Sequence, residues 1–382
     1  MTFMETSGHY LDNSATTQVL KEAADEAFRL MVEDYGNPSS LHTRGFLAKK
    51  RLESAREAIA NRLGAQPEEI FFTGGGTEAN NLALLGGALA RKRLGRKIVT
   101  TAIEHDSVLN AARELERQGF QVTYVQPESD GNLDPGKLAE AIDRDTVLVS
   151  VMLCNNETGA LLPVQAAARA IKRREAPALL HTDCVQAFCK VDFSPKKLGA
   201  DLCTISGHKI HGPKGVGALY VKKGVRILPQ TFGGGQEKGL RSGTESLPLI
   251  GAFAKAADLA PRPGDLLARM EDLQKLLRQE LLSIPGVRIN SPSGGLPYIL
   301  NFSPVGVRAE TMLHFLAGRG VFVSAGSACG KAKPSHVLEA MGLPQEQVAS
   351  ALRASFSRFS TGEDAAALAE GIRAGLACLE KE

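Results

Sequence analysis

Short apolar runs alternate with helical patterns along the first two thirds of the chain. Each run is almost continuous in its apolar residues, as in TVLVSVMLC at 146–154, which indicates strands buried on both faces. Such strands in alternation with helices predict an α/β protein with a largely parallel sheet covered on both sides. The expected strands lie at 68–73, 97–104, 121–126, 146–154, 178–183, 201–206 and 217–222.

The pattern changes near residue 260, where Pro261 and Pro263 interrupt it. Beyond this point Leu266, Met270 and Leu273 form part of one apolar stripe, which predicts a long helix. We therefore expect a large domain over 15–258 and a smaller α+β domain over 259–382 that includes 1–14. Further strands are expected at 298–303 and 320–326, and helices at 106–118, 134–142, 163–174, 309–318, 335–341, 345–351 and 364–378.

The composition argues against several classes of protein. The 382 residues include 45 Lys+Arg and 42 Asp+Glu, a net charge of +3, so we expect neither direct nucleic-acid binding nor a polybasic membrane surface. No apolar run reaches the roughly 18 residues of a membrane-spanning helix, and the first residues lack a secretory-signal pattern. The 6 cysteines contain no C-x-x-C pair, which favours reduced thiols in a cytoplasmic protein without a metal site.

A glycine-rich motif, FFTGGGTEANN, follows the first expected strand. Ligands of parallel sheets bind at the carboxyl ends of the strands, so loops after strands are the informative ones. The glycines allow an anion to approach the backbone, and a helix opening at Thr77 would offer free N–H groups. The motif is neither a nucleotide P-loop nor G-x-G-x-x-G, so a single phosphate is the expected ligand, with an unusual tight turn as the alternative.

Three later motifs place ionisable side chains after strands. Lys209 in ISGHKIHGPKG fits a Schiff-base lysine, although a solvated surface loop is the alternative. Asp183 ends an apolar strand, where a buried carboxylate needs a cation such as a protonated pyridine; a helix cap is the alternative. His105 fits a residue that stacks on a flat ring and moves protons, although a lone histidine is more often structural.

A phosphate loop, a stacking histidine, a pyridinium-facing aspartate and a Schiff-base lysine together meet the needs of pyridoxal 5′-phosphate. Other segments accompany them in order over nearly the whole chain: YLDNSATT (10–17), YGNPSSLH (35–42), NNETG (155–159), GGGQEKGLRSGT (233–244), SAGSAC (324–329) and LRASFSRF (352–359). On these motifs the sequence resembles the group-I cysteine desulfurases, pyridoxal-phosphate-dependent enzymes of the class-V aminotransferase family. The resemblance implies a fold-type I architecture with a mainly parallel seven-stranded sheet.

The resemblance also implies the reaction. L-cysteine would be converted to L-alanine while its sulfur passes to Cys329 as a persulfide. Lys209 would form the Schiff base and move the Cα proton, and His105 would stack on the ring as acid or base. The thiolate is the reactive form of Cys329. The implied partners are a second copy of the chain and a sulfur-acceptor protein, either an iron–sulfur cluster scaffold or a thiolation enzyme.

The binding residues implied by the resemblance fall into two groups. Around the cofactor they are Gly76, Thr77, His105, Asn156, Asp183, Gln186, Ser206, His208, Lys209 and Thr244 of the partner subunit. Around the substrate they are Asn37, Asn156 and Arg353, whose planar guanidinium suits a carboxylate.

Some features depart from the family pattern. The loop after Cys329 reads GKAKPSH, about two residues shorter than in well-known members, which reduces its reach. Gly76 stands where an alanine is common. A selenocysteine lyase or another cysteine lyase of the same fold is the alternative activity. A non-catalytic sulfur-trafficking adaptor is disfavoured by the intact set of Lys209, Asp183 and His105.

Overall fold

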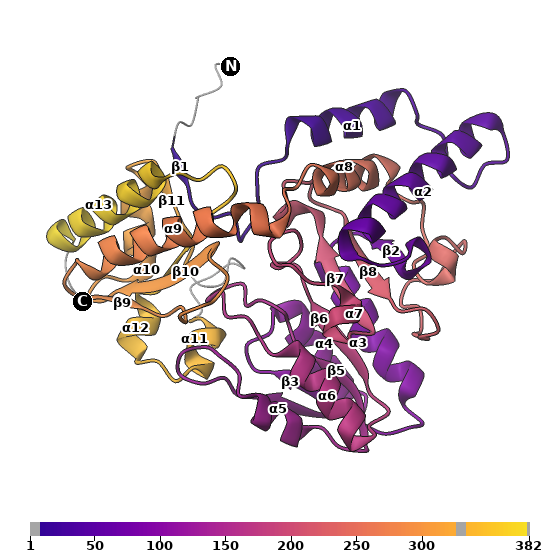
Figure 1. Ribbon diagram of the computed structural model, residues 1–382, viewed down its shortest axis with the longest axis horizontal. Helices are drawn as coiled ribbons and strands as arrows, with labels where there is room; N and C mark the ends of the chain where they lie inside the picture. The colour runs from indigo at the N-terminus through magenta and orange to yellow at the C-terminus, as the bar shows by residue number, and fades with distance from the viewer. Residues whose placement is uncertain (1–7, 326–333, 380–382) are drawn as a thin grey trace.

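A seven-stranded sheet forms the centre of the larger part of the molecule, in the order β2-β8-β7-β6-β5-β3-β4 (Figure 1). The computed structural model describes residues 8–325 and 334–379. The strands from β4 to β7 pair in parallel, whereas β8 is antiparallel to both of its neighbours. The expected mainly parallel sheet is therefore confirmed. The strands are β2 (Ile70–Thr73), β3 (Lys97–Thr101), β4 (Gln121–Val125), β5 (Thr146–Ser150), β6 (Leu179–Asp183), β7 (Leu202–Ser206) and β8 (Gly217–Val221).

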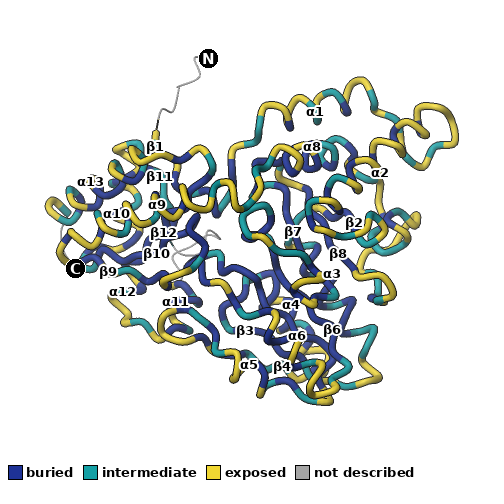
Figure 2. Tube along the Cα trace, viewed as in Figure 1, coloured by how far each residue is buried: buried dark blue, intermediate teal, exposed yellow. Residues whose placement is uncertain are grey.

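Helices cover both faces of this sheet. Consecutive residues of a strand point to opposite faces: Leu148 belongs to the apolar cluster beneath α3 (Gly76–Arg91) and α4 (Asp106–Arg117). Val149 belongs to the cluster on the other face. All residues of β5, β6, β7 and β8 are buried, which explains their nearly continuous apolar sequences (Figure 2). The second face is covered by α5 (Pro135–Ala141), α6 (Val164–Arg174) and α8 (Leu247–Asp258).

Several elements had no counterpart in the sequence patterns. Helices α1 (Lys21–Val32) and α2 (Thr43–Leu63) both pack against α8. The remaining short elements of this part are α7 (Pro195–Leu198) and the 3-10 turns η1 (Pro67–Glu69), η2 (Gly207–Lys209) and η3 (Glu237–Gly239).

The smaller part contains a three-stranded sheet in the order β12-β10-β9, flanked by helices. A separate pair, β1 (His9–Tyr10) and β11 (Val321–Phe322), is parallel and joins the N-terminal segment to this part. The expected strand at 320–326 is therefore too long, because its partner β1 offers only two residues for pairing. The other elements are α9 (Pro263–Leu282), β9 (Val287–Ile289), β10 (Ile299–Pro304), α10 (Ala309–Ala317), α11 (His336–Ala340), α12 (Gln345–Ala349), β12 (Leu352–Ser355) and α13 (Gly362–Cys378).

The division into domains at 15–258 and 259–382, with 1–14 in the smaller domain, stays a prediction that this arrangement supports. Cys154 and Cys203 are buried as expected. Within 8–325 and 334–379, no helix combines the length and the apolar character needed to cross a bilayer.

Candidate active site

A cavity of about 280 Å³ lies between the carboxyl ends of the parallel strands and the smaller part of the molecule. Its walls bring together most of the residues singled out from the sequence: Gly76, Thr77, His105, Asn156, Asp183, Gln186, Ser206, His208, Lys209 and Arg353. The motifs that are dispersed along the chain therefore meet in one place, and the roles of these residues stay predictions.

Asn37, Thr244 and Cys329 are the predicted site residues that the cavity does not include. Asn37 is exposed, and its Oδ1 accepts a hydrogen bond from the Ser39 N–H at 2.8 Å within its own turn. Thr244 is also exposed. Neither lines the cavity of its own chain. Cys329 lies outside the described residues.

One end of the cavity is suited to an anion. Helix α3 begins at Gly76 directly after β2, so the free N–H groups of its first turn face this end. A Cβ added to Gly76 would lie 3.0 Å from Val185 Cγ2 and 3.7 Å from Ser206 Cβ. Glycine at this position therefore allows the start of α3 to lie close to Val185 and Ser206. The Ser206 hydroxyl is buried without a hydrogen-bond partner among the described residues. Burial lowers the pKa of His208, which also lines the cavity, to about 4.

Asp183 lies at the last position of β6 with both carboxylate oxygens engaged. Its Oδ1 accepts from the Val185 N–H at 2.9 Å, and its Oδ2 accepts from Asn80 Nδ2 at 2.7 Å. The first bond is the local, cap-like role considered for this residue. The second fixes the carboxylate toward the cavity, which Asn80 also lines. Asn80 also donates to Ser107 Oγ at 2.8 Å.

His105 caps the N-terminus of α4 and also lines the cavity. Its Nδ1 accepts from the Ser107 N–H at 3.1 Å, so the structural alternative holds for this nitrogen. An Nδ1 that accepts a backbone N–H carries no proton, which assigns the ring proton to Nε2. His105 can therefore cap α4 through Nδ1 and still offer a proton at Nε2.

Lys209 ends the turn η2 that follows β7. Its Nζ donates to the carbonyl oxygens of Ser14 at 2.5 Å and Ala15 at 2.7 Å. Burial lowers the pKa of Lys209 to about 7, and the nearby charges of Arg353 and Lys190 act in the same direction. Near neutral pH a substantial fraction of this amine is therefore unprotonated and nucleophilic.

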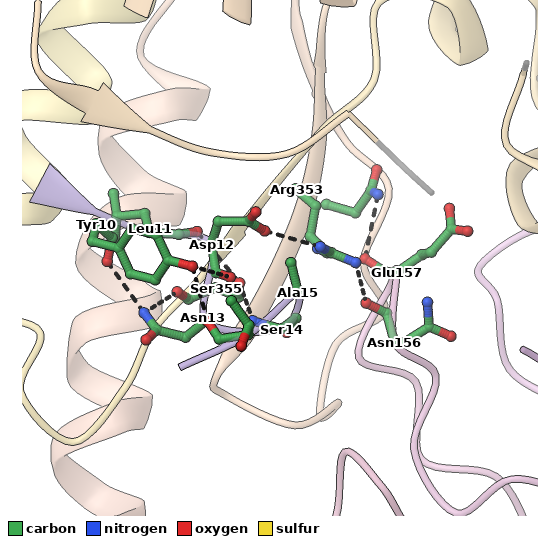
Figure 3. Close-up of polar contacts among 12 residues, drawn as sticks. Tyr10, Leu11, Asp12, Asn13, Ser14, Ala15, Asn156, Glu157, Arg353 and Ser355 are labelled. Carbon is green, nitrogen blue, oxygen red and sulfur yellow. Dashed lines mark hydrogen bonds and ion pairs between the residues drawn. The ribbon is translucent and has the colours of Figure 1, made fainter. Parts of the chain in front are cut away.

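Arg353, on β12, also lines the cavity, and Figure 3 shows its contacts with Asp12 and Asn156. Its Nη1 donates to the Asn156 carbonyl at 2.9 Å, and its Nη2 donates to Asp12 Oδ1 at 3.0 Å. The side chain is 2% exposed, and its Nε has no partner among the described residues. A buried guanidinium with an unused donor is suited to bind a carboxylate.

Sequence reasoning missed several residues of this site. Glu157 is buried and accepts a hydrogen bond from the Ser335 hydroxyl. His336 lines the cavity and contacts the Glu104 carbonyl through Nε2 at 3.0 Å. Glu104 itself is fully buried, and burial raises its pKa to about 8. The motifs NNETG, EHDSV and PSH contain these residues, but only the fold brings the motifs into contact.

The residues present fit pyridoxal phosphate. Unpaired buried polar atoms are costly, so they indicate an absent partner. In the described parts of the chain such atoms at the cavity are Asn80 Oδ1, Gln186 Oε1, Ser206 Oγ and Arg353 Nε. The first turn of α3 is suited to the phosphate, and Asp183 is suited to the ring nitrogen. Lys209, whose pKa is lowered to about 7, is suited to the aldehyde. Residues 8–325 and 334–379 contain no cluster of His, Cys, Asp and Glu that would hold a metal ion.

Comparisons with known proteins agree with this geometry. The family model described as "Aminotransferase class-V" matches residues 9–368. "Cysteine desulfurase IscS" of Methanosarcina thermophila is 41% identical over 364 residues, covering 94% of this chain and 90% of that protein. "Cysteine desulfurase 2" of Trichormus variabilis is 43% identical over 356 residues, covering 92% and 89%.

Solved structures give the same result. A "NIFS-LIKE PROTEIN" superimposes with a TM-score of 0.92 at 38% identity, covering 97% of this chain and 100% of that one. "SspA in complex with cysteine" gives a TM-score of 0.82 at 33% identity, covering 92% and 100%. The chain therefore belongs to the cysteine desulfurases of the class-V aminotransferase family.

Proposed function

We propose that this desulfurase removes sulfur from L-cysteine, releases L-alanine and retains the sulfur on Cys329 before passing it on. The observation that carries the proposal is the single cavity that is lined by Lys209, Asp183 and Arg353 together. This combination of side chains matches an amino acid whose amino group meets the cofactor while its carboxylate meets an arginine. One solved relative is named as a complex with cysteine, which supports the same substrate class.

Bound pyridoxal phosphate supplies an electron sink that stabilises negative charge at the Cα of an amino acid. The chain's own residues do the rest. Asp183 would hold the ring nitrogen protonated through its charge, and Asn80 keeps that carboxylate in place at 2.7 Å. Lys209 Nζ would hold the aldehyde and would move the proton at Cα. The turn at Gly76 and Thr77, together with Ser206 and His208, would bind the phosphate, and Gln186 and Asn156, which line the same cavity, would contact the ring.

The sulfur-transfer step uses Cys329 as its thiolate. The thiolate attacks the sulfur of the substrate, so an S–S bond forms while the Cβ–S bond breaks. The electron pair of the broken bond stays with the three-carbon fragment, which takes up a proton and leaves as L-alanine. One thiol and one L-cysteine thus give one persulfide and one L-alanine, and no outside oxidant is needed.

A homodimer would complete the site. Thr244 and Asn37 are exposed and do not line the cavity of their own chain, which supports Thr244 of the partner subunit as a phosphate ligand. The loop before it is held firmly: Arg56 binds both carboxylate oxygens of Glu237 at 2.8 Å, and Arg241 Nε binds Glu78 at 2.7 Å. A rigid loop can present an exposed residue to a neighbour.

A sulfur-acceptor protein, an iron–sulfur cluster scaffold or a thiolation enzyme, would take the persulfide sulfur. The described cysteines are all unpaired (Cys154, Cys184, Cys189, Cys203 and Cys378). Free thiols support the reducing cytoplasm as the compartment.

The test is a single turnover of the purified holoenzyme with L-cysteine. We expect alanine and a persulfide on Cys329, detected by mass spectrometry of its peptide. Cys329→Ala should still change the visible spectrum of the cofactor on adding L-cysteine but form no persulfide. Cys378→Ala is the matched control, because Cys378 is exposed and unpaired, and it should behave as wild type. A persulfide that persists in Cys329→Ala would overturn the assignment.

A further inference from the structure

We propose that Asp12 is a positioning residue for Arg353, and that the N-terminal segment 10–15 is thereby part of the amino-acid recognition site. The inference rests on the proposed function, in which Arg353 binds the carboxylate of L-cysteine. Asp12 does not line the cavity itself, so it acts through the arginine rather than on the substrate.

The contacts of Arg353 fix the plane of its guanidinium. Nη2 donates to Asp12 Oδ1 at 3.0 Å, and Nη1 donates to the Asn156 carbonyl at 2.9 Å (Figure 3). Two partners on different terminal nitrogens remove the rotation that a long arginine side chain otherwise retains. Nε is left without a partner among the described residues, and the donors not used by these partners remain available for a ligand.

Because Arg353 is buried, the loss of its partner Asp12 should be costly. The side chain of Arg353 is 2% exposed and that of Asp12 is 21% exposed. A buried cation requires a compensating charge or a full set of hydrogen bonds. Within 8–325 and 334–379, Asp12 is the carboxylate in ion-pair contact with Arg353. Removing it would leave the Asn156 carbonyl as the one hydrogen-bond partner of the guanidinium among the described residues.

The backbone holds Asp12 at this position independently of its side chain. Ser355 N–H donates to the Leu11 carbonyl at 2.6 Å, and Ser14 N–H donates to Ser355 Oγ at 2.8 Å. Asn13 Nδ2 donates to the Ser355 carbonyl at 2.9 Å. Ser355 lies two residues after Arg353 on β12. The segment 10–15 is therefore attached to the strand that presents the arginine, on both sides of Asp12.

The same segment also contacts Lys209, another residue that lines the cavity. The carbonyls of Ser14 and Ala15 accept from Lys209 Nζ. A short piece of chain thus sets the positions of the amine that meets the cofactor and of the cation that meets the carboxylate. Such preorganisation lowers the entropy lost when a ligand binds. Asp12 should therefore affect binding of ligands that carry a carboxylate and leave other amines unaffected.

The experiment compares two thiol-free amines on the holoenzyme: L-alanine, which has a carboxylate, and ethylamine, which lacks one. Their Kd values are measured from the change in the visible absorbance of the cofactor. Asp12→Ala should raise the Kd for L-alanine and the KM for L-cysteine about tenfold, with kcat within about twofold of wild type. The Kd for ethylamine should not change. Asp12→Asn should recover most of the loss, because its amide oxygen still accepts from Nη2.

Two further variants separate the possible outcomes. Asp25→Ala removes a carboxylate that is 63% exposed on α1, outside both the segment 10–15 and the cavity, so both Kd values should match wild type. Arg353→Gln should abolish the preference for L-alanine; if it does not, the proposed carboxylate role of Arg353 fails. If Arg353→Gln weakens L-alanine but Asp12→Ala does not, or if Asp12→Ala weakens both amines equally, the role of Asp12 alone is overturned.

Discussion

The two walls of the cavity are built differently. On the side of the large sheet, His105, Asp183 and Lys209 each lie within a few residues of the end of a buried strand. On the side of the smaller part, Arg353 lines the cavity and meets Asp12 across 341 positions of sequence. The first wall depends on the register of a sheet. The second depends on the pairing of β12 with β10, which sets Arg353 opposite Asn301, and on the bridge that joins Asp12 to Ser355 from a distant part of the chain.

This difference separates chemistry from recognition. The paired register of β6 and β7 sets Asp183 opposite Thr204, so the position of this carboxylate follows from the sheet. Under the proposed function, the sheet wall acts on the cofactor and the other wall selects the amino acid. Substitutions in the sheet wall should therefore lower kcat, whereas those at Asp12 and Arg353 should raise KM.

The largest effect is expected for Lys209→Ala. Loss of the amine that we propose to move the Cα proton should lower kcat by about 10³-fold or more. The measurement is alanine release under saturating L-cysteine. Lys214→Ala is the matched control, because Lys214 is exposed in the same loop and does not line the cavity. Comparable kcat values for Lys209→Ala and Lys214→Ala would contradict a catalytic role for the sheet wall.

Asp183→Asn should follow, with kcat lower by about 10²-fold, because in the proposed role a neutral amide would not hold the ring nitrogen protonated. The KM for L-cysteine should change little, which distinguishes this variant from those at Arg353. Asp192→Asn serves as control, since the Asp192 side chain is 82% exposed. A rise in KM without a fall in kcat would place Asp183 in recognition instead.

Asn80→Ala should have a smaller effect in the same direction. It removes the 2.7 Å bond that fixes Asp183 Oδ2 but leaves the carboxylate charged, so we expect kcat to fall about fivefold to tenfold. Combining it with Asp183→Asn should add little further loss, because both act through one carboxylate. Asn110→Ala, at an exposed position of α4, should leave kcat unchanged. If the losses in kcat from Asn80→Ala and Asp183→Asn were fully additive, the two residues would not act through one carboxylate.

The smallest effect concerns Glu104, whose backbone carbonyl contacts His336. Its pKa is about 8 in the fold because it is buried, against an ordinary value of 4.5. Between these values the unfolded chain has lost this proton and the folded chain has kept it, so folding stability falls as pH rises.

Glu104→Gln does not titrate in either state. The variant should therefore gain stability relative to wild type as pH rises from 5 to 8, on the order of 1 kcal/mol per pH unit. Thermal unfolding at both pH values measures this difference. Glu116→Gln, an exposed position on α4, is the control. A difference that shrinks with rising pH would contradict a buried, protonated Glu104.

Much of the sheet wall could be predicted from the sequence. The strands ending near Thr73, Asp183 and Ser206 lie where their apolar runs end, and parallel strands bring such ends to one edge. The roles assigned to Lys209 and Asp183 came from combining motifs that were each ambiguous alone. Each motif was ambiguous because its residue also has a local structural role. His105 and Asp183 both accept hydrogen bonds from backbone N–H groups two residues further along the chain.

What the sequence alone determined is the periodicity, because strands, helices and turns are decided by residues that are neighbours along the chain. It also supplied the motifs that place the chain in its family. Tertiary structure alone decided that Asn80 holds Asp183, that Asp12 holds Arg353 and that Ser14 and Ala15 hold Lys209. These contacts join segments with no common local pattern, and their geometry follows only from how the buried faces pack together.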